Sequence, residues 1–107
     1  MNMNNQVAII TGAGRGVGRA TALLFARAGA KVVLFSRTRA QLEEVAASIT
    51  QDGGDALLVV GDVAREEDVL ALFEQVRERY GRLDILVNCA GIVAIRPFLE
   101  MDTATWD

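Results

Sequence analysis

The sequence predicts an α/β domain built on a doubly wound parallel sheet. Short apolar runs alternate with longer amphipathic stretches along the 107 residues, which is the pattern of strands joined by crossover helices. The apolar runs lack polar alternation, so helices should cover both faces of the sheet. With right-handed crossovers, four strands take the order 3-2-1-4. A chain of this length with 51% hydrophobic residues forms a single core.

Each element is predicted from its local pattern. The four strands are expected at residues 7–10, 31–35, 56–60 and 85–87, and the helices at residues 18–28, 39–50 and 66–80. The last helix is the clearest, because an apolar stripe follows three acidic residues whose charge complements the helix dipole. Gly29, Gly53 and Gly81 follow the three helices, where a left-handed cap residue is wanted. After the fourth strand we expect a loop through Pro97 and the first turn of a further helix at residues 102–107.

Composition excludes several classes of function. The net charge is −3 and the basic residues are scattered, so nucleic acid is not expected as a partner. No apolar run approaches the ~18 residues that span a bilayer, and the polar N-terminus is not a signal peptide, so we expect a cytoplasmic protein without a membrane segment. With no histidine and one cysteine, Cys89, the chain offers no zinc-ligand spacing and no internal disulfide.

A glycine-rich segment, TGAGRGVG from Thr11 to Gly18, joins the first strand to the first helix. Free backbone N–H groups and the positive end of a helix meet at such a turn, where a phosphate group fits. The segment matches neither the GxGxxG dinucleotide spacing nor a Walker A loop, and only a longer GxxxGxG spacing remains. Taken alone, it is either a phosphate-binding loop or a plain turn.

Three motifs together point to one family. Thr11, Gly12, Gly16 and Gly18 match a TGxxxGxG loop, the segment Gly61-Asp62-Val63 follows the third strand, and Asn88-Cys89-Ala90-Gly91 follows the fourth. In this order and spacing the chain resembles the N-terminal half of the short-chain dehydrogenase/reductase family, whose fourth-strand motif is NNAG. The resemblance implies a Rossmann-type dinucleotide-binding domain over residues 1–107. The residues that it assigns to the cofactor are Gly12, Ala13, Gly14, Arg15, Gly16, Val17, Ser36, Arg37, Asp62, Val63, Asn88, Ala90 and Gly91.

One position departs from the family motif, and two others match it. Cys89 replaces the second asparagine of NNAG, and we interpret it as a small buried residue that lacks the bracing amide. Asp62 and Val63 correspond to the family's adenine-contacting aspartate and its neighbour.

The residue after the second strand is expected to select the cofactor. A carboxylate at this position binds the ribose hydroxyl of NAD and repels the 2′-phosphate of NADP. Here Ser36 occupies it, Arg37 follows, and Arg15 lies within the glycine loop. Two cations near one phosphate predict a preference for NADP(H) over NAD(H). The alternative is that both arginines are ordinary solvated charges.

The catalytic residues implied by the resemblance are absent. Family members transfer a hydride between a nicotinamide and a carbonyl or alcohol carbon, and a tyrosine, a lysine four residues later and a serine handle the proton. The only tyrosine, Tyr80, is followed four positions later by Asp84, and the only lysine is Lys31. Ser36 is assigned to the ribose and Ser48 lies within a helix. We therefore name no catalytic residue, and expect the chain alone to be inactive.

Three hypotheses follow for the chain as a whole. It is a truncated NADP(H)-dependent oxidoreductase, a nucleotide-binding half-domain without turnover, or a decayed gene product. A coding sequence that continues beyond residue 107 into a tyrosine with a lysine four residues later would support the first. Substrate stays open, although the chain resembles 3-oxoacyl-carrier-protein reductases and residues 92–101 would be either near the substrate or packing.

Truncation has a predicted physical cost. In the order 3-2-1-4 the fourth strand lies on an edge, where its apolar residues are open to pairing with other chains. We therefore expect a marginally stable monomer that self-associates through this edge.

Overall fold

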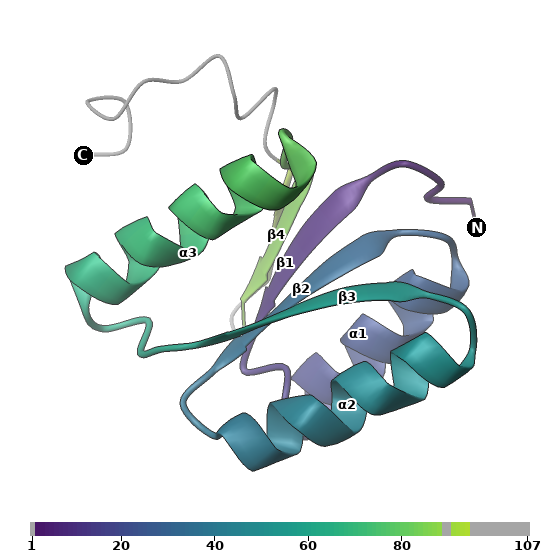
Figure 1. The fold of residues 1–107 in the computed structure, drawn as a ribbon, viewed down its shortest axis with the longest axis horizontal. Coiled ribbons are helices and arrows are strands. Elements are labelled where there is room, and N and C mark those ends of the chain that lie inside the picture. Colours follow the sequence, from purple (N-terminus) through teal and green to yellow (C-terminus); the bar gives the residue numbers. More distant parts are fainter. Residues whose placement is uncertain (1, 89–90, 95–107) are drawn as a thin grey trace.

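The computed structural model describes residues 2–88 and the backbone of residues 91–94. This part of the chain forms a sheet with the strand order β3-β2-β1-β4-β5 and helices packed on both of its faces (Figure 1). The strands are β1 (Val7–Thr11), β2 (Lys31–Ser36), β3 (Asp55–Val60), β4 (Ile85–Asn88) and β5 (Gly91–Ala94), and the helices are α1 (Gly16–Arg27), α2 (Arg39–Gln51) and α3 (Glu66–Tyr80).

The parallel part of the sheet has the predicted order. β1 lies at its centre, with β2 on one side and β4 on the other, and β3 pairs with β2. Because the four strands are parallel and in register, their carboxyl ends meet at one edge. Thr11 lies opposite Phe35, and Ser36 lies opposite Val60. Any groove at this edge is therefore reached by all four strands.

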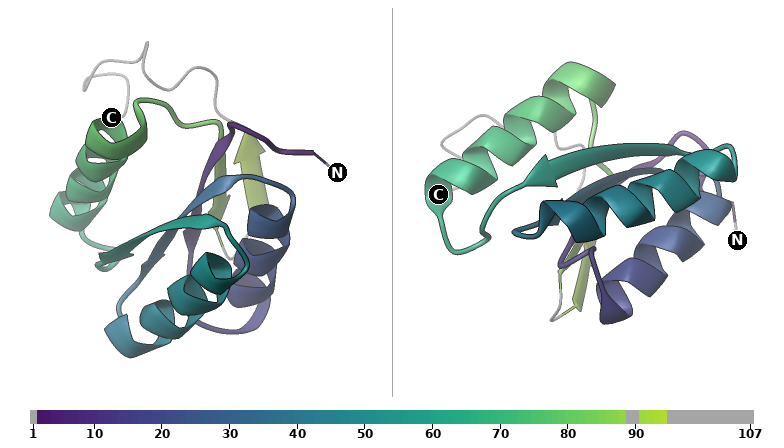
Figure 2. Two further views of the ribbon diagram at one scale, coloured as in Figure 1. Left: turned by 45° about the vertical axis from the view of Figure 1, so that its right-hand side comes forward. Right: turned by 60° about the horizontal axis from the view of Figure 1, so that its bottom comes forward.

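The core has two layers that explain why the strands are apolar throughout. α1 and α2 cover one face of the sheet and α3 covers the other (Figure 2). In β1, Ala8 and Ile10 pack with the first two helices, whereas Val7 and Ile9 pack with α3. All four are at most 1% exposed. Alternate residues of one strand thus enter different cores, which confirms the prediction that both faces are covered.

The helices begin and end close to the predicted residues. α3 has the predicted bounds, whereas α1 begins at Gly16, two residues earlier than expected. Gly29, Gly53 and Gly81 follow the helices with φ angles of 102°, 85° and 72°, so each takes the left-handed conformation that glycine adopts without a steric penalty. Within residues 2–88 and 91–94, no helix combines the length and the apolar character needed to cross a membrane.

The fourth strand is not an edge strand, which corrects the prediction. β5 pairs antiparallel with β4, from Asn88 opposite Gly91 to Ile85 opposite Ala94. The chain reverses directly after β4, so its own next segment takes up the backbone N–H and C=O groups that a neighbouring chain would otherwise have met. The expected loop through Pro97 and the helical turn at residues 102–107 lie outside the described residues.

Asp84 joins the first residues of β1 and the start of β4. The Val7 N–H donates to Asp84 Oδ2 at 2.8 Å, and the Asp84 N–H donates to the Val7 carbonyl at 2.9 Å. Arg82 donates to both carboxylate oxygens, at 3.0 and 2.6 Å. Partial burial raises the pKa of Asp84, but the hydrogen bonds from Arg82 and Val7 outweigh it, so that this pKa is lowered overall.

Candidate functional site

A groove of about 1260 Å³ opens at the carboxyl edge of the sheet. Its walls come from the ends of β1, β2, β3 and β4, from the segments that follow them, and from parts of α1, α2 and α3. This is where open parallel sheets bind ligands, because the strand order reverses on either side of β1. The volume is larger than the roughly 300–1000 Å³ of pockets that hold one compact small molecule. It suits an extended ligand.

The glycine loop forms one wall of the groove by packing unusually close to its own helix. Gly12 has φ of 64°, and its N–H donates to the Phe35 carbonyl at 2.8 Å. A Cβ atom at Gly18 would lie 2.1 Å from the Gly12 carbonyl oxygen, and one at Gly14 would lie 2.8 Å from the Gln41 Cβ. Side chains at these positions would therefore force the loop away from α1 and α2.

Among the described residues, no side chain caps the amino end of α1. The residue before the helix, Arg15, makes no side-chain capping bond, and the first turn contains no acidic residue. By contrast, α3 carries Glu66, Glu67 and Asp68 in its first turn. The positive end of the α1 dipole therefore lies beside the groove, where it favours an anion.

Both predicted specificity arginines line this groove. Arg15 approaches from the glycine loop, and Arg37 approaches from the segment after β2. Both are exposed. The Ser36 Oγ, also at the groove, accepts a hydrogen bond from the Thr38 N–H at 3.2 Å. Among the described residues that line the groove, Asp62 is the one acid, so the β2 side presents positive charge alone.

Asp62 and Val63 form the opposite part of the groove, after β3. The Asp62 Oδ1 accepts the Ala64 N–H at 2.9 Å, which holds the carboxylate in a local turn. Val63 is 59% exposed, and Val17, which also lines the groove, is 82% exposed. Two exposed apolar side chains can thus contact a flat apolar surface of a ligand, and one carboxylate can accept a hydrogen bond from it.

Most of the residues predicted to bind the cofactor meet at this one groove. Ala13 differs, because its side chain is fully buried in the core beneath α1 and α2. Ala90 and its neighbour Cys89 lie outside the described residues, and Gly91 is described as the first residue of β5. The predicted residues that line the groove are Gly12, Gly14, Arg15, Gly16, Val17, Ser36, Arg37, Asp62, Val63 and Asn88.

Several groove residues were missed by sequence reasoning. Thr38 directly precedes α2, Gln41 lies in its first turn, and Phe73 comes from the middle of α3. The first two follow the Ser36-Arg37 pair within one helical turn, and this closeness could have identified them. Phe73 belongs to the apolar stripe of α3, and no sequence feature separates it from the stripe's other core residues.

Tyr80 and Lys31 are close together in space, although they are far apart in the chain. The Lys31 Nζ lies 5.7 Å from the centroid of the Tyr80 ring. However, the Tyr80 hydroxyl donates to Asp55 Oδ1 at 2.9 Å, and this oxygen also pairs with Arg79 at 3.2 Å. Asp55 begins β3 and Lys31 begins β2, so the cluster lies at the amino edge of the sheet, away from the groove.

The environment of Tyr80 also opposes proton transfer. Burial and the hydrogen bond to Asp55 raise its pKa above the ordinary value of 10.0. A tyrosine that acts as a base near neutral pH needs a lowered pKa instead. As described, Tyr80 and Lys31 are therefore not arranged for proton transfer near neutral pH.

The fold and the groove together define a class of protein. A parallel sheet of order 3-2-1-4 with a glycine loop at the amino end of its first helix is a Rossmann-type fold. The family model described as short chain dehydrogenase matches residues 6–107. The chain belongs to this family.

Similar proteins of known sequence support the assignment. An uncharacterized oxidoreductase of Listeria monocytogenes is 40% identical over 107 residues, and a 3-oxoacyl-[acyl-carrier-protein] reductase of Synechocystis is 39% identical over 102 residues. The chain covers 43% and 41% of these relatives, so that it spans about two-fifths of their length. The short-chain dehydrogenase/reductase homolog YusS of Bacillus subtilis differs in this respect. It is 35% identical over 108 residues, which are 100% of this chain and 99% of that relative.

Solved structures agree with the fold. The L-sorbose reductase of Gluconobacter frateurii, in complex with NADPH and L-sorbose, matches with a TM-score of 0.80 and 40% identity, covering 99% of this chain and 41% of the other. A 7α-hydroxysteroid dehydrogenase in complex with NADH matches with a TM-score of 0.79 and 38% identity, covering 81% and 34%. These two similar structures therefore hold different nicotinamide cofactors.

Proposed function

We propose that this chain binds the adenosine and pyrophosphate part of a nicotinamide dinucleotide, NADP(H) in preference to NAD(H), within a carbonyl–alcohol oxidoreductase. The observation that carries the proposal is the single groove that joins the glycine loop, the Ser36-Arg37 pair and Asp62. Each of the three segments follows a different strand, and together they offer complementary groups to a phosphate, a ribose and a base.

The residues present fit this ligand. Close packing of Gly18 against the Gly12 carbonyl lets the loop backbone reach the pyrophosphate, since no side chain intervenes. The amino end of α1 supplies N–H donors to the same group. We assign the adenine to the Asp62 side, where the carboxylate can accept a hydrogen bond from the amino group of the base.

The preference for NADP(H) rests on charge. Arg15 and Arg37 reach the groove from two segments, and the connection from β2 to α2 offers no carboxylate to the ribose. A phosphate between two guanidinium groups gains charge-assisted hydrogen bonds. The Ser36 hydroxyl is compatible with the phosphate, because a hydroxyl carries no negative charge that would repel the phosphate.

The bound nicotinamide dinucleotide would supply the hydride for a carbonyl or alcohol substrate. The chain's own groups would bind and orient the adenosine end, since the only tyrosine is held by Asp55 at the other edge of the sheet. We therefore propose that proton transfer to the substrate depends on residues outside those described here.

The YusS relative favours a second candidate function. It is a curated protein of almost the same length as this chain, which is compatible with a nucleotide-binding domain that has no turnover of its own. Both candidates need the same cofactor site, and differ in whether a carbonyl substrate is consumed.

The proposal is tested by titrating the chain with NADPH and with NADH, with binding measured by calorimetry and by cofactor fluorescence. We expect NADPH to bind at least about tenfold more tightly at low salt, and the difference to shrink as salt rises. Equal affinities would overturn the preference, and binding of neither cofactor would overturn the function. Oxidation of NADPH upon addition of a carbonyl substrate would favour the enzyme over the binding domain.

A further inference from the structure

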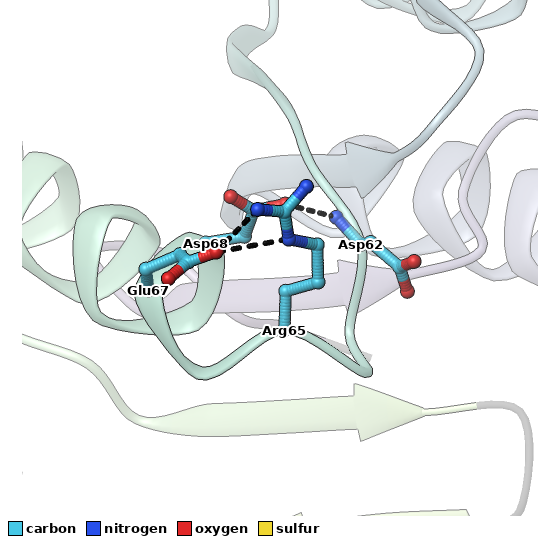
Figure 3. A network of polar contacts seen from close by, with 4 residues as sticks. All are labelled: Asp62, Arg65, Glu67 and Asp68. Atoms are coloured by element: carbon cyan, nitrogen blue, oxygen red, sulfur yellow. Dashed lines mark hydrogen bonds and ion pairs between the residues drawn. The ribbon is translucent and has the colours of Figure 1, made fainter.

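Asp68 contacts the segment that lines the adenosine end of the groove. It is the third residue of α3, and its Oδ2 accepts the backbone N–H of Asp62 at 2.9 Å (Figure 3). In a capping box, the third residue of a helix accepts the N–H of the residue just before that helix. Asp68 instead accepts an N–H that lies six residues back along the chain. This bond joins α3 to the turn that follows β3.

The backbone of this turn is also held from the other side. Its first residue, Gly61, donates its N–H to the Ser36 carbonyl at 2.9 Å. A Cβ atom at Gly61 would lie 2.7 Å from the ring of Phe35 and 3.2 Å from the Asp68 Cβ. The turn therefore fits between β2 and the first turn of α3, and Asp68 supplies both a packing contact and a hydrogen bond.

This contact determines how the Asp62 side chain leaves the backbone. The Asp62 N–H is fixed by Asp68, and the Asp62 Oδ1 is fixed by the Ala64 N–H. Among the described residues, Asp62 Oδ2 has no hydrogen-bond partner, and Asp62 lines the groove. One carboxylate oxygen is thus left to a ligand, in a direction set by the other two bonds.

The remaining charges of the α3 first turn are used differently. Arg65 pairs with Glu67, and both side chains are mostly exposed (Figure 3). This ion pair does not include the groove residue Asp62. Glu67 is therefore a matched control for Asp68: it is a neighbouring acid on the same helical turn, but its carboxylate bonds Arg65 and not the Asp62 N–H.

We infer that Asp68 is a positioning residue that orients Asp62 for recognition of the adenine amino group. The inference rests on the proposed function, because it assigns to Asp68 a role in the selectivity of that same site. Without the bond to Asp68, the peptide between Gly61 and Asp62 loses one of the hydrogen bonds that hold this turn, and the Asp62 carboxylate has a less defined direction toward the base.

The test compares two ligands that differ in this amino group. NADPH and its deamino analogue, in which hypoxanthine replaces adenine, are titrated by cofactor fluorescence against the wild type, Asp68→Ala, Asp68→Asn and Glu67→Ala. We expect the wild type and Glu67→Ala to bind NADPH about tenfold more tightly than the analogue, which corresponds to about 1.4 kcal/mol. In Asp68→Ala the ratio should fall below about threefold, and Asp68→Asn should restore it, because the amide oxygen still accepts the Asp62 N–H.

A purely structural role would lower both affinities equally and leave the ratio unchanged, and this result would overturn the inference while the proposed function stands. If Asp68→Asn lowers the affinity ratio as much as Asp68→Ala does, the inference is likewise overturned and the proposed function stands. Failure of the wild type to bind either ligand would overturn the proposed function and this inference with it. A further measurement needs no variant: the Asp62 amide of the wild type should be protected from hydrogen exchange, and an unprotected amide would contradict the inference.

Discussion

Arg15 and Arg37 illustrate how two residues that are 22 positions apart can act on one group. They enter the groove from the glycine loop and from the end of β2. Both side chains are exposed, so water screens part of each interaction. We therefore propose that the two arginines contribute to cofactor selection by acting together on the doubly charged 2′-phosphate, and not through either charge alone.

Replacing Arg37 by alanine should weaken NADPH binding about tenfold and leave NADH binding nearly unchanged, because the lost hydrogen bond to the 2′-phosphate is charge-assisted but partly solvated. Arg15→Ala should have a similar effect. Calorimetric titration of both cofactors checks this, with Arg19→Ala as a control of equal charge on the exposed side of α1. A parallel loss of NADPH and NADH affinity would argue against a phosphate-specific role.

Tyr80 provides a direct optical measurement, since it is the only tyrosine. Burial and the Asp55 hydrogen bond raise its pKa above 10.0. In the folded state we expect tyrosinate absorbance to remain absent at pH values where the urea-unfolded chain, with a pKa near ~10, has titrated. Because the folded pKa of Tyr80 is the higher one, the stability that its protonated hydroxyl contributes is complete below the unfolded pKa. This contribution is lost as the pH rises toward the folded pKa. Equal titration curves in both states would contradict the Tyr80–Asp55 contact.

At the scale of elements, the close approach of the glycine loop to α1 should be the least tolerant feature of the site. Gly18→Ala places a Cβ 2.1 Å from the Gly12 carbonyl oxygen, so we expect a loss of about 2 kcal/mol or more in unfolding free energy and loss of NADPH binding. Gly53→Ala is the matched control. It has φ of +85° but open space around it, so it should cost about 1 kcal/mol by strain and leave binding intact. Urea unfolding and NADPH titration measure the two effects.

Asp84 should make stability depend on pH at the acid end. Its folded pKa lies below the ordinary value of 3.8, so its stabilisation is present above that value and is lost as the pH falls through the folded pKa. Asp84→Asn should lower the unfolding free energy at neutral pH by about 1 kcal/mol, and flatten its decline below about pH 4. Urea titrations across this range test it, with Glu43→Gln on the exposed face of α2 as the control. An unchanged pH profile would show that the contact between Asp84 and Val7 carries no charge-dependent stability.

The elements themselves were largely predictable, because their causes are local. An apolar run with no alternation gives a strand covered on two sides, and three acids before an apolar stripe give the start of α3. β5 (Gly91–Ala94) was not predicted, because this strand forms only by pairing with β4 after the chain has reversed direction. Its formation depends on this pairing, which four residues do not specify by themselves.

At the scale of the whole molecule, the two edges of the sheet have separate roles. The carboxyl edge carries the groove, whereas the amino edge carries the bonds of Asp84 to Val7 and of Tyr80 to Asp55. Substitutions at the amino edge should therefore change stability without changing cofactor affinity, and this separation makes them useful folding controls.

Self-association remains a prediction, but the strands through which it would occur differ from the predicted fourth strand. Within the described part of the chain, β5 now closes the side that β4 was expected to leave open, and β3 and β5 are the outer strands. Because outer strands present unpaired backbone groups, we expect the mean mass in sedimentation experiments to rise with concentration. A monomer with a thermal transition that is sharp and independent of concentration would contradict this.

The sequence by itself determined the fold class, the strand order of the parallel sheet and most of the groove residues, because glycine spacing, strand hydrophobicity and helix periodicity are local properties. Tertiary structure alone decided that Ala13 turns into the core, that Lys31 lies beside Tyr80, that β5 covers β4 and that Asp68 holds Asp62. The physical reason is the same in each case. These contacts join segments whose meeting depends on how helices and strands pack, and nothing in either segment alone specifies its partner.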